Sequence, residues 1–73
     1  MKFEEKVKYF KDGELSAQTM FRIYGLDQIE NDVIEYQKTL KSIKISKQRY
    51  FYKGYISKAN EIIADCYRDD WEG

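Results

Sequence analysis

Residues 27–43 read DQIENDVIEYQKTLKSI, and apolar side chains recur along this stretch at alternating steps of four and three residues. Such steps place side chains on one face of an α-helix, which turns once every 3.6 residues. Asp27 is a candidate N-cap, and Glu30 is its capping-box partner. The stretch therefore predicts a helix over residues 28–44. The apolar stripe consists of Ile29, Val33, Tyr36, Leu40 and Ile43.

A second apolar stripe with similar spacing predicts a helix over residues 48–68. A break at residues 44–47, with Ser46 as cap, separates it from the first helix. Gly54 lies inside this second helix, where it costs about 1 kcal/mol relative to alanine. Two alternatives stay open: one long unbroken helix, or β structure over residues 43–56, whose Tyr, Phe and Ile content favours strands. The second stripe consists of Tyr52, Tyr55, Ala59, Ile62 and Cys66.

The N-terminal part of the chain predicts two shorter helices, over residues 2–11 and 17–24. Gly13 is expected to end the first and Gly25 the second, because glycine adopts the left-handed conformation that closes helices. A strand over residues 6–10 is the alternative for the first segment. The apolar faces of these two helices consist of Phe3, Val7, Phe10, Met20, Phe21 and Tyr24.

These elements predict an all-α fold. Two helices joined by a short turn pack antiparallel, so residues 27–68 are expected to form an antiparallel helical hairpin. The short helices of residues 2–25 would cover this hairpin. A chain of 73 residues has room for one domain only. The prediction is a small three- to four-helix domain that spans residues 1–73.

The composition predicts a cytoplasmic protein. Cys66 is the only cysteine, so no disulfide can form within one chain, and a lone cysteine fits a reducing compartment. No apolar run approaches the roughly 18 residues of a membrane span, and residues 1–10 lack the apolar core of a secretory signal. The abundance of Lys, Ile, Tyr, Glu and Asp, without Pro or His, suggests an AT-rich genome such as that of a phage or another mobile element.

Charge is segregated along the chain although the net charge is zero. Residues 36–60 carry basic side chains and no acid, whereas residues 61–73 are mainly acidic. On the predicted hairpin these stretches form a basic pole at the turn and an acidic pole at the far end. The basic pole consists of Lys41, Lys44, Lys47, Arg49, Tyr50 and Lys53. The acidic pole consists of Asp27, Glu30, Asp32, Asp65, Asp69 and Asp70.

Several kinds of catalytic and cofactor site are excluded by composition. Without histidine the chain has neither a Ser-His-Asp nor a Cys-His catalytic group, and no Cys/His zinc site. Glycine-rich phosphate-binding loops and the EF-hand pattern are missing. Cys66 lies on the apolar stripe, as expected for a core residue. We therefore expect a protein that is not an enzyme and that binds no cofactor or metal.

The leading hypothesis is a small protein-binding regulator or inhibitor that acts on nucleic-acid-handling machinery. Its acidic pole would occupy a phosphate site of the partner, with Trp71 as an aromatic anchor, since tryptophan is enriched at interface hot spots. The contact residues expected there are Asp65, Asp69, Asp70 and Trp71.

Two alternatives use the same charge pattern. The basic pole could bind nucleic acid, because lysines hold the phosphates and tyrosine rings stack on bases. The protein could instead be a structural protein that associates with itself, since molecules with two opposite poles can pair head to tail.

Overall fold

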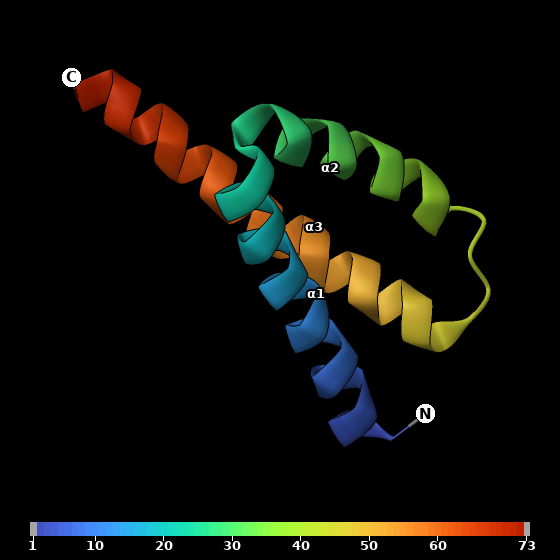
Figure 1. Cartoon of the computed structure of the whole chain (residues 1–73). Coiled ribbons are helices and arrows are strands. Elements are labelled where there is room, and N and C mark those ends of the chain that lie inside the picture. Colours follow the sequence, from blue (N-terminus) through green and yellow to red (C-terminus); the bar gives the residue numbers. More distant parts are fainter. Residues whose placement is uncertain (1, 73) are drawn as a thin grey trace.

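The computed structural model describes the backbone of residues 2–72 and the side chains of residues 2–68. Over that range the chain forms three α-helices and no strand: α1 (Phe3–Tyr24), α2 (Leu26–Leu40) and α3 (Ser46–Glu72) (Figure 1). The predicted all-α class is confirmed. The alternative of β structure over residues 43–56 is wrong, as is the alternative of a single unbroken helix, because residues 41–45 connect α2 to α3.

The three helices alternate in direction (Figure 1). α1 and α3 run the same way and cross each other at an angle, while α2 runs back alongside α3. The largest interface lies between α1 and α3 rather than between α2 and α3. The hairpin of α2 and α3 is therefore only one part of the packing, and α1 is more than a cover for it.

α1 is continuous, so the predicted end of a helix at Gly13 is wrong. Gly13 is buried inside α1 at the crossing with α3, and a Cβ atom there would collide with the carbonyl oxygen of Phe51. Gly54 of α3 has the reciprocal role, because its Cβ atom would collide with the carbonyl oxygen of Phe10. Two glycines thus let the backbones of α1 and α3 touch, which explains why the predicted cost of Gly54 within a helix is tolerated.

The junction between α1 and α2 is a single residue, Gly25. Its φ of 88° lies in the left-handed region that glycine adopts without strain, and its amide donates a 2.9 Å hydrogen bond to the carbonyl oxygen of Phe21. The predicted helix end at Gly25 is confirmed. The predicted N-cap at Asp27 is wrong, because α2 already begins at Leu26.

The core lies where the three helices meet. Ala17 of α1, Ile29 and Val33 of α2, and Tyr55 and Ala59 of α3 are buried. Ala17 and Ala59 lie about one helical turn after Gly13 and Gly54, and both are fully buried. Partly buried apolar side chains that pack against this core are Met20, Phe21, Tyr36, Ile56 and Ile63.

The molecule is elongated, measuring 45 × 23 × 20 Å. Since α1 and α3 start at the same end, the lysine-rich N-terminus of α1 joins the predicted basic pole there (Figure 1). No helix of the described part of the chain is both long enough and apolar enough to span a membrane.

Candidate binding surface

Asp32 of α2 is a buried carboxylate held by two hydrogen bonds. Its Oδ2 accepts a 2.6 Å bond from the Tyr55 hydroxyl of α3, and its Oδ1 accepts a 2.9 Å bond from Nε2 of Gln28. Because Asp32 is only 8% exposed, its predicted place in the acidic pole is wrong. Among the side chains that the structure describes, no buried nitrogen or oxygen lacks a hydrogen-bond partner. This carboxylate joins α2 to α3 instead of facing a partner.

Tyrosine rings surround this hydrogen bond. The Tyr36 ring packs against Tyr55 at 4.8 Å in an edge-to-face geometry and against Tyr52 at 4.6 Å. Burial raises the pKa of Tyr55 far above its usual value, and the hydrogen bond to Asp32 adds to the effect. Burial also raises the pKa of Tyr36, with a further contribution from the Asp32 charge. Both hydroxyls therefore keep their protons, and neither serves as a base.

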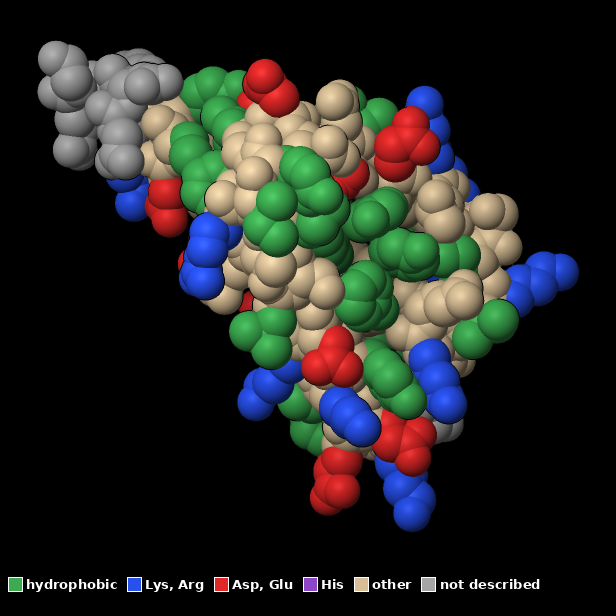
Figure 2. Space-filling model, in the orientation of Figure 1, with side chains coloured by type: hydrophobic (Ala, Val, Ile, Leu, Met, Phe, Trp, Pro, Cys, Tyr) green, Lys and Arg blue, Asp and Glu red, His purple; other side chains and the backbone are tan. Residues whose placement is uncertain are grey.

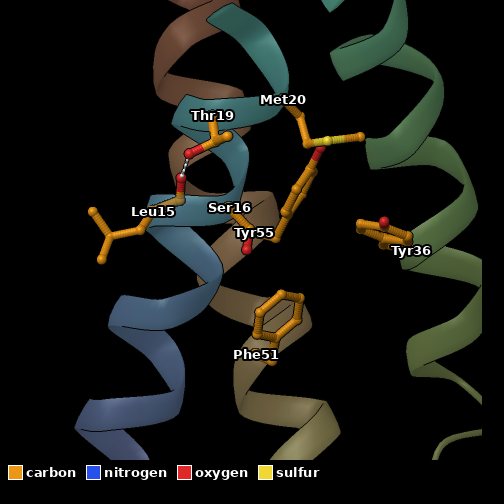
Figure 3. A pocket seen from close by; sticks show the side chains of 7 residues that line it. All are labelled: Leu15, Ser16, Thr19, Met20, Tyr36, Phe51 and Tyr55. Atoms are coloured by element: carbon orange, nitrogen blue, oxygen red, sulfur yellow. Dashed lines mark hydrogen bonds between the residues drawn. The ribbon is translucent and has the colours of Figure 1, made fainter. Parts of the chain in front are cut away.

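A hollow of about 340 Å³ lies between α1 and α2, above this tyrosine cluster (Figure 3). Met20 and Tyr36 face each other across it, while Leu15 points away from the other lining side chains. The Thr19 hydroxyl donates a 3.0 Å bond to the carbonyl oxygen of Leu15, so it is already engaged. Figure 2 shows the same face, with hydrophobic side chains gathered between the helices and most charges at its margin. The hollow offers apolar contact but no acid or base.

A longer groove lies along α1 and α3 on the side away from α2, and we name it the α1–α3 groove. It consists of three hollows in series, of about 450, 280 and 430 Å³, none of which is lined by a residue of α2. Lys11 and Glu14 are shared by the first two hollows, and Gln18 and Lys58 by the last two. The apolar and aromatic side chains that line it are Phe3, Val7, Phe10, Leu15, Phe21, Tyr50 and Ile62.

Cations outnumber acids along the α1–α3 groove. Glu14 is the single carboxylate among the lining residues, and Glu61 lies 3.5 Å from Lys58 at the edge. The ammonium groups of Lys6 and Lys53 lie 5.6 and 5.2 Å from the Tyr50 ring centroid, within cation–π range. The groove is thus mainly apolar in its first hollow, mixed in the other two, and carries an excess of positive charge. Its lining cations are Lys6, Lys11, Arg22 and Lys58.

The predicted basic pole lies around the start of α3. Lys41 and Lys44 are exposed in the connection between α2 and α3, and Lys47 and Arg49 are exposed on the first turns of α3. The Lys47 ammonium group lies 5.8 Å from the Tyr9 ring centroid. Two further predicted members, Tyr50 and Lys53, lie at the entrance of the α1–α3 groove, so the pole and the groove adjoin.

Only Asp65 of the predicted acidic contact site lies among the described side chains; those of Asp69, Asp70 and Trp71 lie outside them. Asp65 is exposed, and its Oδ1 lies 3.9 Å from Nη1 of Arg68. At the same end, the Tyr67 hydroxyl donates a 3.0 Å hydrogen bond to the Glu30 carboxylate. Within the described residues, nothing beyond surface pairing singles out this end as a site.

The sequence reasoning missed the α1–α3 groove. The stripe of Phe3, Val7 and Phe10 was expected to cover a hairpin, whereas Phe3 is 78% exposed. Gly13 carried the missing signal, because a glycine inside a helix-like pattern also marks a close helix crossing. Phe10 and Tyr50, which lie close to this crossing, line the groove.

Comparisons of the chain with protein-family models, with curated proteins and with solved structures find no match. Among the described side chains, no group of three or more Cys, Asp or Glu residues is arranged to hold a metal ion.

Proposed function

We propose that this protein is a small non-enzymatic regulator or inhibitor that binds another protein through the α1–α3 groove. The observation that carries the proposal is the groove itself. Three adjoining hollows follow α1 from Phe3 to Arg22 and are left open by α2; the first is mainly apolar, and the other two combine apolar with polar and charged side chains. Exposed apolar surface that is rimmed by polar side chains, as in the first hollow, is typical of a protein interaction site.

The buried polar groups support a binding role over a catalytic one. Both carboxylate oxygens of Asp32 are engaged by side chains of the same chain, and the neighbouring tyrosine hydroxyls stay protonated. These groups, which would be the natural candidates for acid–base chemistry, instead hold the helices together.

We also propose a setting for this regulator. Its composition suits a phage or mobile-element protein that acts in the cytoplasm on a partner that handles nucleic acid. The C-terminal residues remain a proposed second contact to that partner, through Asp65, Asp69, Asp70 and Trp71.

A capture experiment with host proteins tests the proposal. Phe3→Glu places a charge in the groove at a side chain that is 78% exposed, so the fold should persist. Ile34→Glu is the matched control, because Ile34 is an exposed apolar residue of α2 (53% exposed) that does not line the groove. Phe3→Glu should lose a partner that the wild type and Ile34→Glu both retain. An identical set of captured proteins from all three would refute the groove as the binding surface.

Nucleic-acid binding by the basic pole is the second candidate, favoured by the placement of Lys47 beside Tyr9 and of Lys53 beside Tyr50. Lysines that adjoin aromatic rings can combine phosphate contacts with base stacking. Binding to random single-stranded DNA and RNA should then weaken steeply with salt. The double variant Lys44→Glu with Lys47→Glu should abolish it, while Arg68→Glu at the opposite end of α3 should not. Absence of binding at low salt would rule this candidate out.

A further inference from the structure

We propose that the α1–α3 groove seats one amphipathic α-helix of a partner protein, with acidic residues beside its apolar stripe and with a direction antiparallel to α1 and α3. This inference rests on the proposed function and deepens it, because it assigns the chemistry of the partner segment and its orientation.

The direction of the helices defines an open position for such a segment. α1 and α3 run the same way, and α2 runs against them on one side (Figure 1). The groove lies on the other side, since none of its lining residues belongs to α2. A fourth helix antiparallel to the α1–α3 pair would take the position opposite α2, and it would run in the same direction as α2.

The length of the groove suits a helix of several turns. Its lining residues extend along α1 from Phe3 to Arg22. At a rise of about 1.5 Å per residue this is about 28 Å, which a helix of roughly 18 residues spans. The apolar lining recurs along that length: Phe10 in the first hollow, Leu15 in the second and Phe21 in the third. A helix with an apolar stripe along its whole length can contact each of these side chains.

Charge complementarity selects an acidic helix. Lys6, Lys11, Arg22 and Lys58 line the groove against the single carboxylate of Glu14. Opposite charges at the margin of an apolar interface steer association and disfavour wrong partners. A basic amphipathic helix or a neutral one would bring no opposite charge to Lys6, Lys11 and Arg22.

Helix dipoles favour the antiparallel direction. The N-termini of α1 and α3 lie at the same end of the groove, next to the basic pole. A helix N-terminus carries partial positive charge and a C-terminus partial negative charge. An antiparallel partner helix brings its negative C-terminus to that end. The helix dipoles and the side-chain charges therefore both favour this orientation.

Selection from a peptide library tests this inference. The probe is a displayed library of 18-residue helices with a fixed leucine stripe and random Asp, Glu, Lys, Arg, Ser or Gln at the flanking positions. Selection on the intact wild-type protein should enrich Asp and Glu at those flanks. Lys11→Glu should weaken the enriched peptides at least tenfold, whereas Lys44→Glu, outside the groove, should leave their affinity unchanged. Selection on the Lys11→Glu protein should enrich Lys or Arg at one flanking position of the peptides, because the residue of the groove that faces this position is then negative.

Several outcomes would overturn the inference: no enrichment, enrichment of basic or neutral flanks, or affinity that is insensitive to Lys11→Glu. The same holds if sedimentation reveals a wild-type dimer that Phe3→Glu dissolves, because a second copy would then fill the groove. A peptide labelled at its C-terminus should cross-link near Tyr50 and not near Ile62; the reverse would overturn the assigned direction.

The inference and the proposed function can fail separately. If acidic helices bind as described but Phe3→Glu captures the same host proteins as the wild type, the regulatory function fails and the helix-binding groove stands. If Phe3→Glu loses a host partner whose cross-linked segment is not an acidic helix, the function stands and the inference is overturned.

Discussion

The two sides of the α1–α3 pair have opposite character. On one side Ile29 and Val33 of α2 are buried, and the Tyr55 hydroxyl donates a hydrogen bond to Asp32. The apolar side chains there are shielded from water, and the buried carboxylate has a hydrogen-bond partner. On the other side the α1–α3 groove leaves Phe3 and Leu15 78% and 60% exposed. The comparison predicts that the α2 side and the crossing contribute more to stability than the exposed side chains of the groove do.

Substitutions at the crossing of α1 and α3, which both sides share, should lower the unfolding free energy most. Gly13→Ala and Gly54→Ala each place a Cβ atom against a backbone carbonyl oxygen, which cannot move without separating the helices. We expect each variant to lose about 3 kcal/mol of unfolding free energy. The higher helix propensity of alanine, worth roughly 1 kcal/mol, is too small to offset the collision. Urea unfolding followed by circular dichroism measures the loss.

Ser57→Ala is the control for these glycine variants, because Ser57 is exposed in α3 and the same alanine should be neutral or slightly stabilising there. Glycine variants as stable as the wild type would show that the two backbones do not touch.

Removing the hydrogen bond between Tyr55 and Asp32 on the α2 side should cause the next largest loss of unfolding free energy. Tyr55→Phe removes the 2.6 Å bond and leaves the buried Asp32 carboxylate with Gln28 alone. We expect a loss of about 2 kcal/mol, as is usual for a hydrogen bond to a charged buried group. Tyr24→Phe is the control, since Tyr24 is 61% exposed. Equal stability of the two variants in urea unfolding would show that the bond contributes nothing.

High pH should weaken the α2 side selectively. The pKa values of Tyr55 and Tyr36 are raised by burial, so the folded state keeps protons that the unfolded state loses above about pH 10. The stabilisation is complete below pH 10 and decreases above it, by at most about 1.4 kcal/mol per pH unit for each such tyrosine. Urea unfolding between pH 8 and 11.5 should show a steeper decline for the wild type than for Tyr36→Phe. Parallel declines would contradict this assignment.

Substitutions on the groove side should change the unfolding free energy least. Phe3→Glu is expected to change the unfolding free energy by less than about 0.5 kcal/mol, because the side chain is already largely in water. Thermal unfolding of Phe3→Glu beside wild type measures the difference. A large loss would mean that this side holds the fold after all, and the contrast between the two sides would break down.

The sequence predicted what local patterns determine. The stripe of α2 follows from the spacing of Ile29, Val33 and Tyr36, and the end of α1 at Gly25 follows from the conformation that glycine permits. Lys44 and Lys47 of the basic pole are exposed, as is usual for lysine side chains.

What the sequence did not predict depends on contacts between distant residues. Gly13 has the local signature of a helix end, and only the neighbouring backbone of α3 shows that it serves a crossing. Asp32 resembles any surface acid until Tyr55, remote in sequence, donates to it. The groove was missed for the same reason, since it exists only because α1 and α3 lie side by side in parallel.

The parallel pairing of α1 and α3 also bears on how the chain folds. α2 and α3 are joined by the short connection of residues 41–45, so their pairing closes a small loop, whereas the contact of Gly13 with Phe51 joins segments far apart in sequence. Closing the longer loop costs more conformational entropy, and contacts of this kind form slowly. Docking of α1 is therefore expected to complete folding, and the groove comes into existence at that last step. A helix bound in the groove would contact both α1 and α3 and so slow their separation, which makes the lifetime of the folded state itself dependent on the partner.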